Sequence, residues 1–313
     1  GRTVLVLSDG VGHGIKASVL ATLTATMALN YSSFHTKPEI AAQIIMDALP
    51  SSGETPNYAT FTMIEIESNG LIRTINYDNP PVIILRGNQR FIPQKIYETP
   101  VRGEENQGKM LRCMEFYALK EDRIIFLSDG VTQSGIGSPD LKMGWGHQQV
   151  VDFILKQIKN QPKLSATKLA QKIVNRALAN DKYSLRDDTS CGVVYFREPR
   201  EVMLITGPPF YKIKDQGFIQ RIKEFTGMKM ICGGTTAEII ARELGLKLDM
   251  VQYFADMSLP PASILEGFDL VTEGILTISK VEEILENYSA ETRLYDSPAE
   301  EVAKRLLQHD IIY

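Results

Sequence analysis

The chain has 313 residues, of which 43% are hydrophobic and 23% are charged, and its formal net charge is −4. This balance is typical of globular domains and excludes extensive disorder. The net charge leaves no broad basic surface, so nucleic acid is not an expected partner. No apolar run approaches the roughly 20 residues that span a bilayer, and no signal peptide is visible. A chain of this length fits one large domain or two of ordinary size.

Cysteine and histidine are sparse. The three cysteines lie far apart and form no CxxC pair, which is typical of a reducing compartment, so we expect a cytoplasmic protein with free thiols. The four histidines are equally dispersed. The sequence therefore does not support a zinc site.

The first predicted elements are a strand and two helices. A short β-branched strand over residues 3–8 is followed by a glycine-rich turn and a helix over 14–31 that is rich in small residues. Small residues allow this helix to lie close to a sheet. A second, amphipathic helix over 37–50 has Pro38 near its start and Pro50 at its end.

An antiparallel meander follows these helices. Alternating hydrophobicity predicts paired strands, with hairpin turns at Asn69-Gly70 and Gly87-Asn88. The later elements of this part are two strands joined through residues 120–122, helices at about 145–160 and 165–180, and a strand over 189–196. The order predicts an α+β domain in which helices pack on antiparallel sheet.

The composition and pattern of the sequence change at residues 197–200, which are charged and include Pro199. We place a boundary there and expect domains over 1–197 and 198–313. Strands and helices alternate beyond it, with predicted strands in "VMLIT", "KMIC", "DMVQYF" and "FDLVTEG". This alternation predicts a small α/β domain with a mostly parallel sheet.

Three acidic segments lie beside predicted strands: Asp9 in "LSDGVGHG", Asp129 in "FLSDGV", and Asp187 or its neighbour Asp188 in "RDDTS". Each one alone is explained by turn chemistry, because aspartate before glycine is common in turns. If the strands share a sheet edge, however, the carboxylates cannot all stay ionised unless a cation lies among them. Mg²⁺ and Mn²⁺ prefer oxygen ligands, so the pattern predicts a divalent-cation site. The unshielded backbone carbonyl of Gly10 is a further candidate ligand.

Four stretches resemble, in their order along the chain, the stage II sporulation protein E family: "LSDGVGHGIKASVLATL", "YATFTMIEIESNGLIRTINYDNPPVIIL", "DRIIFLSDGVTQS" and "RDDTSCGVVYF". Members of this family are bacterial metal-dependent serine/threonine phosphatases of the PPM, or type 2C, class. The resemblance covers residues 1–197. It implies an α-β-β-α sandwich, with two antiparallel sheets face to face, helices outside, and a two-metal site at one sheet edge.

The resemblance also implies roles for single residues. It makes Asp9 the acid that bridges two Mn²⁺ or Mg²⁺ ions, and Gly10 would offer its carbonyl to one of them. Asp129 and Asp187 would hold the other ion, with Asp188 as a turn residue or a support for the ligands. The implied reaction is attack of a metal-activated hydroxide on phosphoserine or phosphothreonine.

His13 lies between glycines where members of this branch carry "GHG". It is a candidate acid for the leaving serine oxygen, or a neighbour of the metal ligands. We interpret it more simply as a residue that shapes the turn at the helix start, with water able to act as the acid.

The sequence departs from the family at two places. Relatives usually have a strand ending in Gly-Asp before "SDGVGHG", and this chain begins after that point. We therefore expect an N-terminally truncated sandwich with impaired metal binding and an exposed strand edge that could pair with a second copy. In addition, "YDNPP" stands where relatives often have Gly-His before Asn-Pro-Pro, and we interpret Asn79, Pro80 and Pro81 as a rigid strand connection.

The second domain has a candidate ligand site at a strand–glycine–helix junction. Backbone amides at such a helix start can hold a phosphate. The candidate residues are Gly233, Gly234, Thr235 and Thr236, with Thr206, Gly207, Thr272 and Glu273 at the ends of nearby strands. Helix capping and tight turns explain the same residues, and the sequence has no GxGxxG motif and no P-loop lysine.

The leading hypothesis is a Mn²⁺- or Mg²⁺-dependent protein phosphatase. Its expected partner is a phosphorylated regulatory protein, and the resemblance suggests an anti-sigma-factor antagonist. The alternative is a non-catalytic regulator. In that case the first domain would bind a partner and the second would bind a nucleotide or another phosphate compound.

Overall fold

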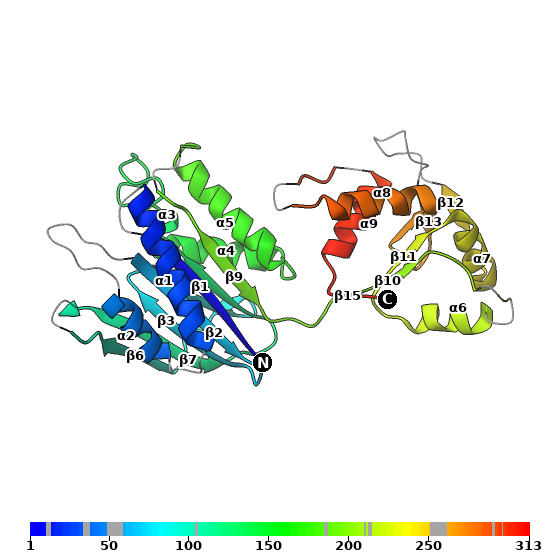
Figure 1. Cartoon of the computed structure of the whole chain (residues 1–313). Helices are drawn as coiled ribbons and strands as arrows, with labels where there is room; N and C mark the ends of the chain where they lie inside the picture. Colours follow the sequence, from blue (N-terminus) through cyan, green and yellow to red (C-terminus); the bar gives the residue numbers. More distant parts are fainter. Residues whose placement is uncertain are drawn as a thin grey trace. The chain divides into compact units, whose positions relative to one another are not determined.

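A computed structural model describes residues 1–10, 14–33, 38–48, 59–103, 106–184, 187–209, 211, 215–250, 262–289, 292–295 and 297–313. In it the chain divides into two compact units, Gly1–Arg197 and Glu198–Tyr313. Figure 1 shows the elements of both units.

Unit 1 contains two antiparallel sheets. The strands of the first sheet follow the order β1-β2-β3-β7-β6, and those of the second the order β5-β4-β8-β9. The bounds in the first sheet are β1 (Arg2–Gly10), β2 (Ala59–Glu67), β3 (Leu71–Tyr77), β6 (Lys95–Pro100) and β7 (Met110–Tyr117). The bounds in the second sheet are β4 (Ile83–Arg86), β5 (Gln89–Arg90), β8 (Asp122–Leu127) and β9 (Cys191–Tyr195).

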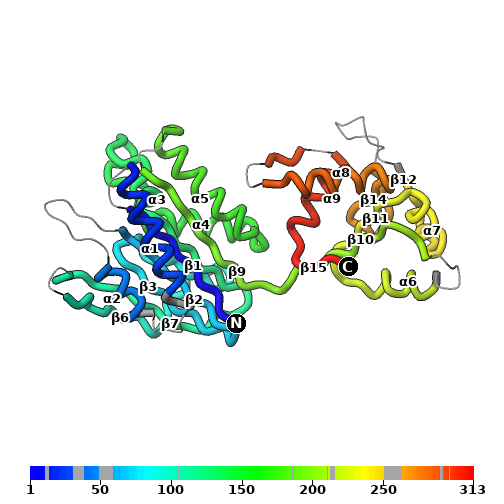
Figure 2. The backbone as a smooth tube through the Cα atoms, viewed as in Figure 1, coloured from blue at the N-terminus to red at the C-terminus, as the bar shows by residue number. Residues whose placement is uncertain are grey.

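Five helices complete the described part of unit 1: α1 (Ile15–Ser33), α2 (Pro38–Ala48), α3 (Asp129–Thr132), α4 (His147–Asn160) and α5 (Ala166–Asn180). Helix α1 runs along the first sheet beside β1 and β2, as the tube in Figure 2 shows. Its small residues make this possible, because Ala17 and Ala28 are buried against the strands.

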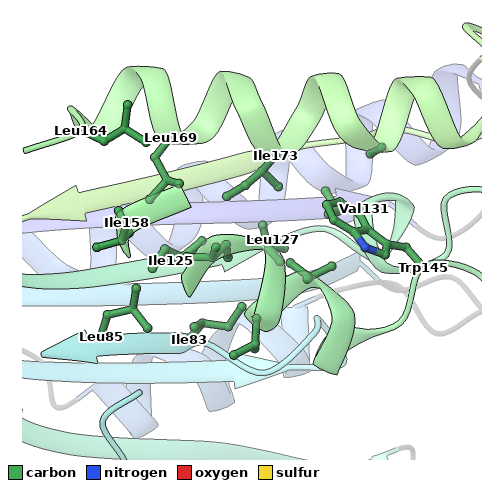
Figure 3. Packing of buried hydrophobic residues seen from close by; sticks show 14 residues of the cluster. Ile83, Leu85, Ile125, Leu127, Val131, Trp145, Ile158, Leu164, Leu169 and Ile173 are labelled. Atoms are coloured by element: carbon green, nitrogen blue, oxygen red, sulfur yellow. The ribbon is translucent and has the colours of Figure 1, made fainter. Parts of the chain in front are cut away.

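Three hydrophobic clusters define the layers of unit 1. One joins α1 and α2 to the first sheet through residues such as Leu20, Ile45 and Phe61. A second lies between the two sheets and includes Ile64 and Phe126. The third joins the second sheet to α4 and α5, and Figure 3 shows its side chains. The layers therefore follow the order helix, sheet, sheet, helix.

The structure corrects several details of the sequence prediction in unit 1. Strand β1 does not stop before its acid but continues through Asp9 and Gly10, both of which pair with β2. The strand β6 was not expected. The two strands joined by residues 120–122 are not neighbours in one meander, because β7 belongs to the first sheet and β8 to the second.

Unit 2 is built around a six-stranded sheet with the order β12-β13-β14-β11-β10-β15. Its strands are β10 (Glu201–Ile205), β11 (Met228–Cys232), β12 (Leu248–Met250), β13 (Ser263–Leu265), β14 (Leu270–Thr272) and β15 (Ile311–Ile312). Its helices are α6 (Asp215–Glu224), α7 (Gly234–Leu244), α8 (Ile275–Glu286) and α9 (Pro298–Leu307). Helices α6 and α7 pack on one face of the sheet, and α8 and α9 pack on the other.

The described strands of unit 2 form a mixed sheet in which three pairings are parallel and two are antiparallel. Strand β11 pairs in parallel with β10 and β14, and β15 is parallel to β10. The pairs β12–β13 and β13–β14 are antiparallel. The strand expected in "DMVQYF" is β12 only as far as Met250, and the rest of that segment lies outside the described residues.

Across both units, the described part of the chain has no helix that combines the length and the apolar character needed to cross a membrane.

Candidate metal centre

Asp9 lies at the end of β1, on the side of the first sheet that faces the second sheet. Side chains alternate along a strand, so Leu5, Leu7 and Asp9 share one face, and the two leucines pack between the sheets. The pKa of Asp9 is raised from 3.8 to about 6. Partial burial is the largest cause of this increase, and the charges of Asp129, Asp187 and Asp188 also contribute to it. The hydrogen-bonded backbone at Gly10 acts in the opposite direction.

Asp129 directly follows β8 of the second sheet. It is the first residue of α3, and its carboxylate accepts a hydrogen bond of 3.0 Å from the side chain of Gln133. Burial raises the pKa of Asp129, and the charges of Asp187 and Asp78 contribute to the increase. Carboxylates from β1, α3 and the segment before β9 thus repel one another at one edge of the sandwich.

Hydrogen bonds from Ser128 fix the segment that carries Asp187 and Asp188. The Ser128 hydroxyl donates to the carbonyl of Asp188 at 2.8 Å and accepts from the amide of Ser190 at 2.9 Å. Gly130 gives this segment room, since a Cβ there would lie 2.5 Å from the Asp188 carbonyl oxygen. The ends of β8 and β9 are therefore held together where their acidic residues lie.

The structure adds Asp78, which the sequence prediction did not single out. It precedes Asn79 in the connection between β3 and β4, and its φ of 59° lies in the left-handed region that few non-glycine residues adopt. Its charge contributes to the raised pKa of Asp129. The available signal was an acid in "YDNPP" at the position where relatives often have a histidine.

Gly10 has a packing role that the sequence did not indicate. A Cβ at Gly10 would lie only 2.1 Å from the carbonyl oxygen of Ala17 in α1. The glycine is thus required for the close approach of α1 to β1, whether or not its own carbonyl binds a metal. His13 lies outside the described residues.

These residues have the chemistry of a divalent-cation site without a complete set of ligands in place. Carboxylates that repel one another are stabilised by a cation, and oxygen donors suit Mn²⁺ and Mg²⁺. Within the described ranges, however, no group of three or more His, Cys, Asp or Glu side chains is close enough together to hold a metal ion. The donor set fits such an ion in charge and in ligand type, and binding would have to draw the carboxylates closer.

In unit 2, several of the predicted ligand residues lie at one sheet edge. The amide of Gly233 donates to the carbonyl of Thr272 at 2.8 Å. The carboxylate of Glu273 lies over Gly234, where a Cβ would be 3.0 Å from its nearer oxygen. A negative side chain therefore lies at the start of α7, the place predicted for a phosphate.

Comparison with known families shows the family of this chain. Residues 1–197 match the family described as stage II sporulation protein E (SpoIIE). The chain therefore belongs to the SpoIIE family, whose members carry a PP2C-type phosphatase domain.

Several solved structures are similar to this chain. The PP2C phosphatase domain with a fragment of the regulatory domain of SpoIIE from Bacillus subtilis is 18% identical, with a TM-score of 0.48. That match covers 63% of this chain and 55% of the other. The RsbU and RsbW domains of Rv1364c from Mycobacterium tuberculosis are also 18% identical, with a TM-score of 0.48 and coverage of 76% and 61%.

A third similar structure is the SiaA-PP2C domain of Pseudomonas aeruginosa. It is 12% identical, with a TM-score of 0.44, and the match covers 62% of this chain and 74% of that one. The chain spans 55% and 61% of the lengths of the first two structures. No curated protein matches the chain.

Proposed function

We propose that unit 1 is a Mn²⁺- or Mg²⁺-dependent protein phosphatase that hydrolyses phosphoserine or phosphothreonine on a bacterial regulatory protein. The observation that carries this proposal is the concentration of acidic residues at one edge, where burial and the charges of Asp129, Asp187 and Asp188 raise the pKa of Asp9. Burial and the charge of Asp187 also raise the pKa of Asp129. Family membership gives the reaction class. The protein substrate, of which an anti-sigma-factor antagonist is the kind suggested by the resemblance, is part of the proposal.

In the proposed site, Asp9, Asp129 and Asp187 hold the cations, and the carbonyl of Gly10 is an additional ligand. Bound Mn²⁺ or Mg²⁺ would supply Lewis acidity toward phosphoryl oxygens and would lower the pKa of water. The chain contributes concentrated negative charge in a partly buried place, where the attraction for a cation is stronger than in bulk water. The Ser128 hydroxyl keeps Asp188 and its neighbour in position beside Asp129.

A cysteine nucleophile is not supported at this edge. Cys191 begins β9, close to the acidic segment, and burial raises the pKa of its thiol to about 12. A thiol with this pKa is protonated near neutral pH and is a poor nucleophile. The acidic residues of this edge fit cation-assisted hydrolysis better than thiol catalysis.

Phosphate release from a phosphoserine peptide by the full-length protein tests the proposal. We expect activity with Mn²⁺, loss of activity in EDTA, and recovery when Mn²⁺ is added back. The variant Cys191→Ala is the matched control, and it should keep its Mn²⁺-dependent turnover. Activity that persists in EDTA but disappears in Cys191→Ala would rule out the metal-dependent reaction.

A further inference from the structure

A buried polar network lies beside Asp9, between the two sheets. Asn79 is 7% exposed, and Thr62 is fully buried. The hydroxyl of Thr60 donates to the side-chain oxygen of Asn79 at 2.7 Å and also lies 3.3 Å from the carbonyl oxygen of Asp9. One hydroxyl group therefore connects the end of β1 to the connection between β3 and β4.

The same network also holds the rest of that connection. The side-chain amide of Asn79 donates to the Thr62 hydroxyl at 3.0 Å. Asn76 donates to the Thr62 hydroxyl at 3.2 Å and to the carbonyl of Pro80 at 3.0 Å. The ring of His147, the first residue of α4, lies 3.0 Å from the carbonyl oxygen of Pro81. Residues 78–81, defined here as the Asn-Pro-Pro loop, are thus fixed from three directions.

Strand register explains why this loop lies next to the acidic edge. Asp9 pairs with Thr60, and Phe61 pairs with Tyr77. Tyr77 is the last residue of β3, so Asp78 and Asn79 follow directly at the end of the sheet where Asp9 pairs with Thr60.

The polar groups of this network are not explained by packing alone. Thr60, Thr62 and Asn76 occupy positions on the inter-sheet face, where Leu7 and Ile64 pack in the same rows. Apolar residues would fill such positions at lower cost, since a buried polar group contributes little net stability and is costly when left unpaired. Every side chain of the network makes a hydrogen bond that leads to Asp9 or to the Asn-Pro-Pro loop.

We propose that Asn79 is a positioning residue for the cation site, and that it acts on Asp9 and on the Asn-Pro-Pro loop through Thr60 and Thr62. The inference rests on the proposed phosphatase function. It predicts that the hydrogen bonds of Asn79, rather than its bulk, set the separation between the end of β1 and the loop that carries Asp78. Groups that orient metal ligands typically change metal affinity or activity about 10–100-fold when they are removed.

The test measures Mn²⁺ binding to the full-length protein by calorimetry, so its readout does not depend on turnover. Asn79→Ala removes the network's centre, and Thr60→Val removes the shared hydroxyl with little change in shape. Thr60→Ser restores that hydroxyl. Asn106→Ala is the stability control. Asn106 lies in the connection between β6 and β7 and is 5% exposed. Its side chain hydrogen-bonds Asp47 of α2 and also Arg102 and Lys109.

We expect Asn79→Ala and Thr60→Val to weaken Mn²⁺ binding by roughly 10–100-fold, while Thr60→Ser and Asn106→Ala bind as the wild type does. Unchanged Mn²⁺ affinity in Asn79→Ala, or an equal loss in Asn106→Ala, would overturn the inference. A wild-type protein that binds Mn²⁺ through this network but hydrolyses no phosphoserine peptide would refute the proposed function alone. A wild-type protein that binds no Mn²⁺ would refute both.

Discussion

Two sheet edges in this protein end in glycine-containing turns, and they differ in the arrangement of their carboxylate side chains. At the edge of unit 1, acidic residues from three distant segments interact, and burial together with the neighbouring carboxylates raises the pKa of Asp9 and of Asp129. At the edge of unit 2, a single carboxylate, that of Glu273, lies over the glycine at the start of α7. The first arrangement accumulates charge of one sign, whereas the second places a negative charge at the positive end of a helix.

The difference shows which strand–glycine junctions indicate a site. The carboxylate at the start of α7 is favourable by itself, because it complements the helix dipole. Asp9, Asp129 and Asp187 repel one another, and such an arrangement is costly unless something else compensates for it. Unfavourable charge that hydrogen bonds nevertheless hold in place is thus a stronger indication of function than glycine spacing alone.

Neutralising one carboxylate at each edge should give the largest contrast. We expect Asp129→Asn to lower kcat/KM for a phosphoserine peptide by roughly 100-fold or more, whereas Glu273→Gln leaves turnover unchanged. Asp152→Asn on the exposed face of α4 is a control for the loss of one negative charge. Steady-state phosphate release with Mn²⁺ is the measurement, and full activity in Asp129→Asn would remove Asp129 from the mechanism.

Removing one buried hydroxyl at each edge should separate the two regions in stability. Ser128→Ala breaks two hydrogen bonds, to Asp188 and Ser190, and we expect a loss of about 1–3 kcal/mol because buried partners stay unsatisfied. Thr272→Val removes contacts of 3.3 Å to the sulfur of Cys232 and 3.2 Å to a carbonyl. It should cost about 0.5–1.5 kcal/mol.

Urea unfolding of both variants in EDTA measures these differences. The loss in Ser128→Ala should be accompanied by weaker activation by Mn²⁺, and Thr272→Val should leave activation unchanged. The reverse pattern would mean that Ser128 does not support the acidic segment.

The stability of the metal-free protein should depend on pH through Asp9 at the edge of unit 1. The pKa of Asp9 is raised to about 6 in the folded state from 3.8, so the folded state binds this proton more tightly than the unfolded state. Its contribution to stability is fully present below pH 3.8 and is lost as the pH rises through 6. We therefore expect Asp9→Asn to flatten the decrease in unfolding free energy between pH 4 and 7, as measured by urea titration in EDTA.

The smallest expected effect concerns anion binding in unit 2. Because Glu273 lies where a phosphate was predicted, inorganic phosphate should not raise the melting temperature of wild-type protein through unit 2. Glu273→Gln should cost about 0.3–1 kcal/mol of stability through the lost helix-terminus interaction, and it should allow phosphate to stabilise the variant. Strong stabilisation of the wild type by phosphate that disappears in Thr236→Val would instead favour the regulatory alternative.

Much of the fold could be predicted from the sequence because its signals are local. Alternation and hairpin turns located β2 and β3, and amphipathic periodicity located α4 and α5. The membership of β7 and β8 in different sheets could not be predicted, because a short turn such as 120–122 joins strands within a sheet or between sheets equally well. The sheet of unit 2 is mixed because β13 pairs antiparallel with both β12 and β14. The direction of such a pairing depends on two segments together, so it could not be predicted from either one alone.

The metal ligands predicted from "SDG" and "RDDTS" stay a prediction. The charges of Asp129, Asp187 and Asp188 do contribute to the raised pKa of Asp9. Asp78 was missed because its importance depends on where β3 ends, which is beside the residues that pair with the end of β1. The role of Gly10 in admitting α1 was missed for a similar reason, since the approach of Ala17 is a tertiary contact.

If carboxylates from three segments form one cation site, the titration of Asp9 must respond both to its acidic neighbours and to the cation. In EDTA, carboxyl ¹³C NMR should give Asp9 a pKa of about 6, and Asp129→Asn should lower that value. Saturating Mg²⁺ should shift the titration of Asp9 to far more acidic pH, because the cation competes with the proton. An Asp9 that titrates near 3.8 in EDTA and does not respond to Mg²⁺ would contradict the account.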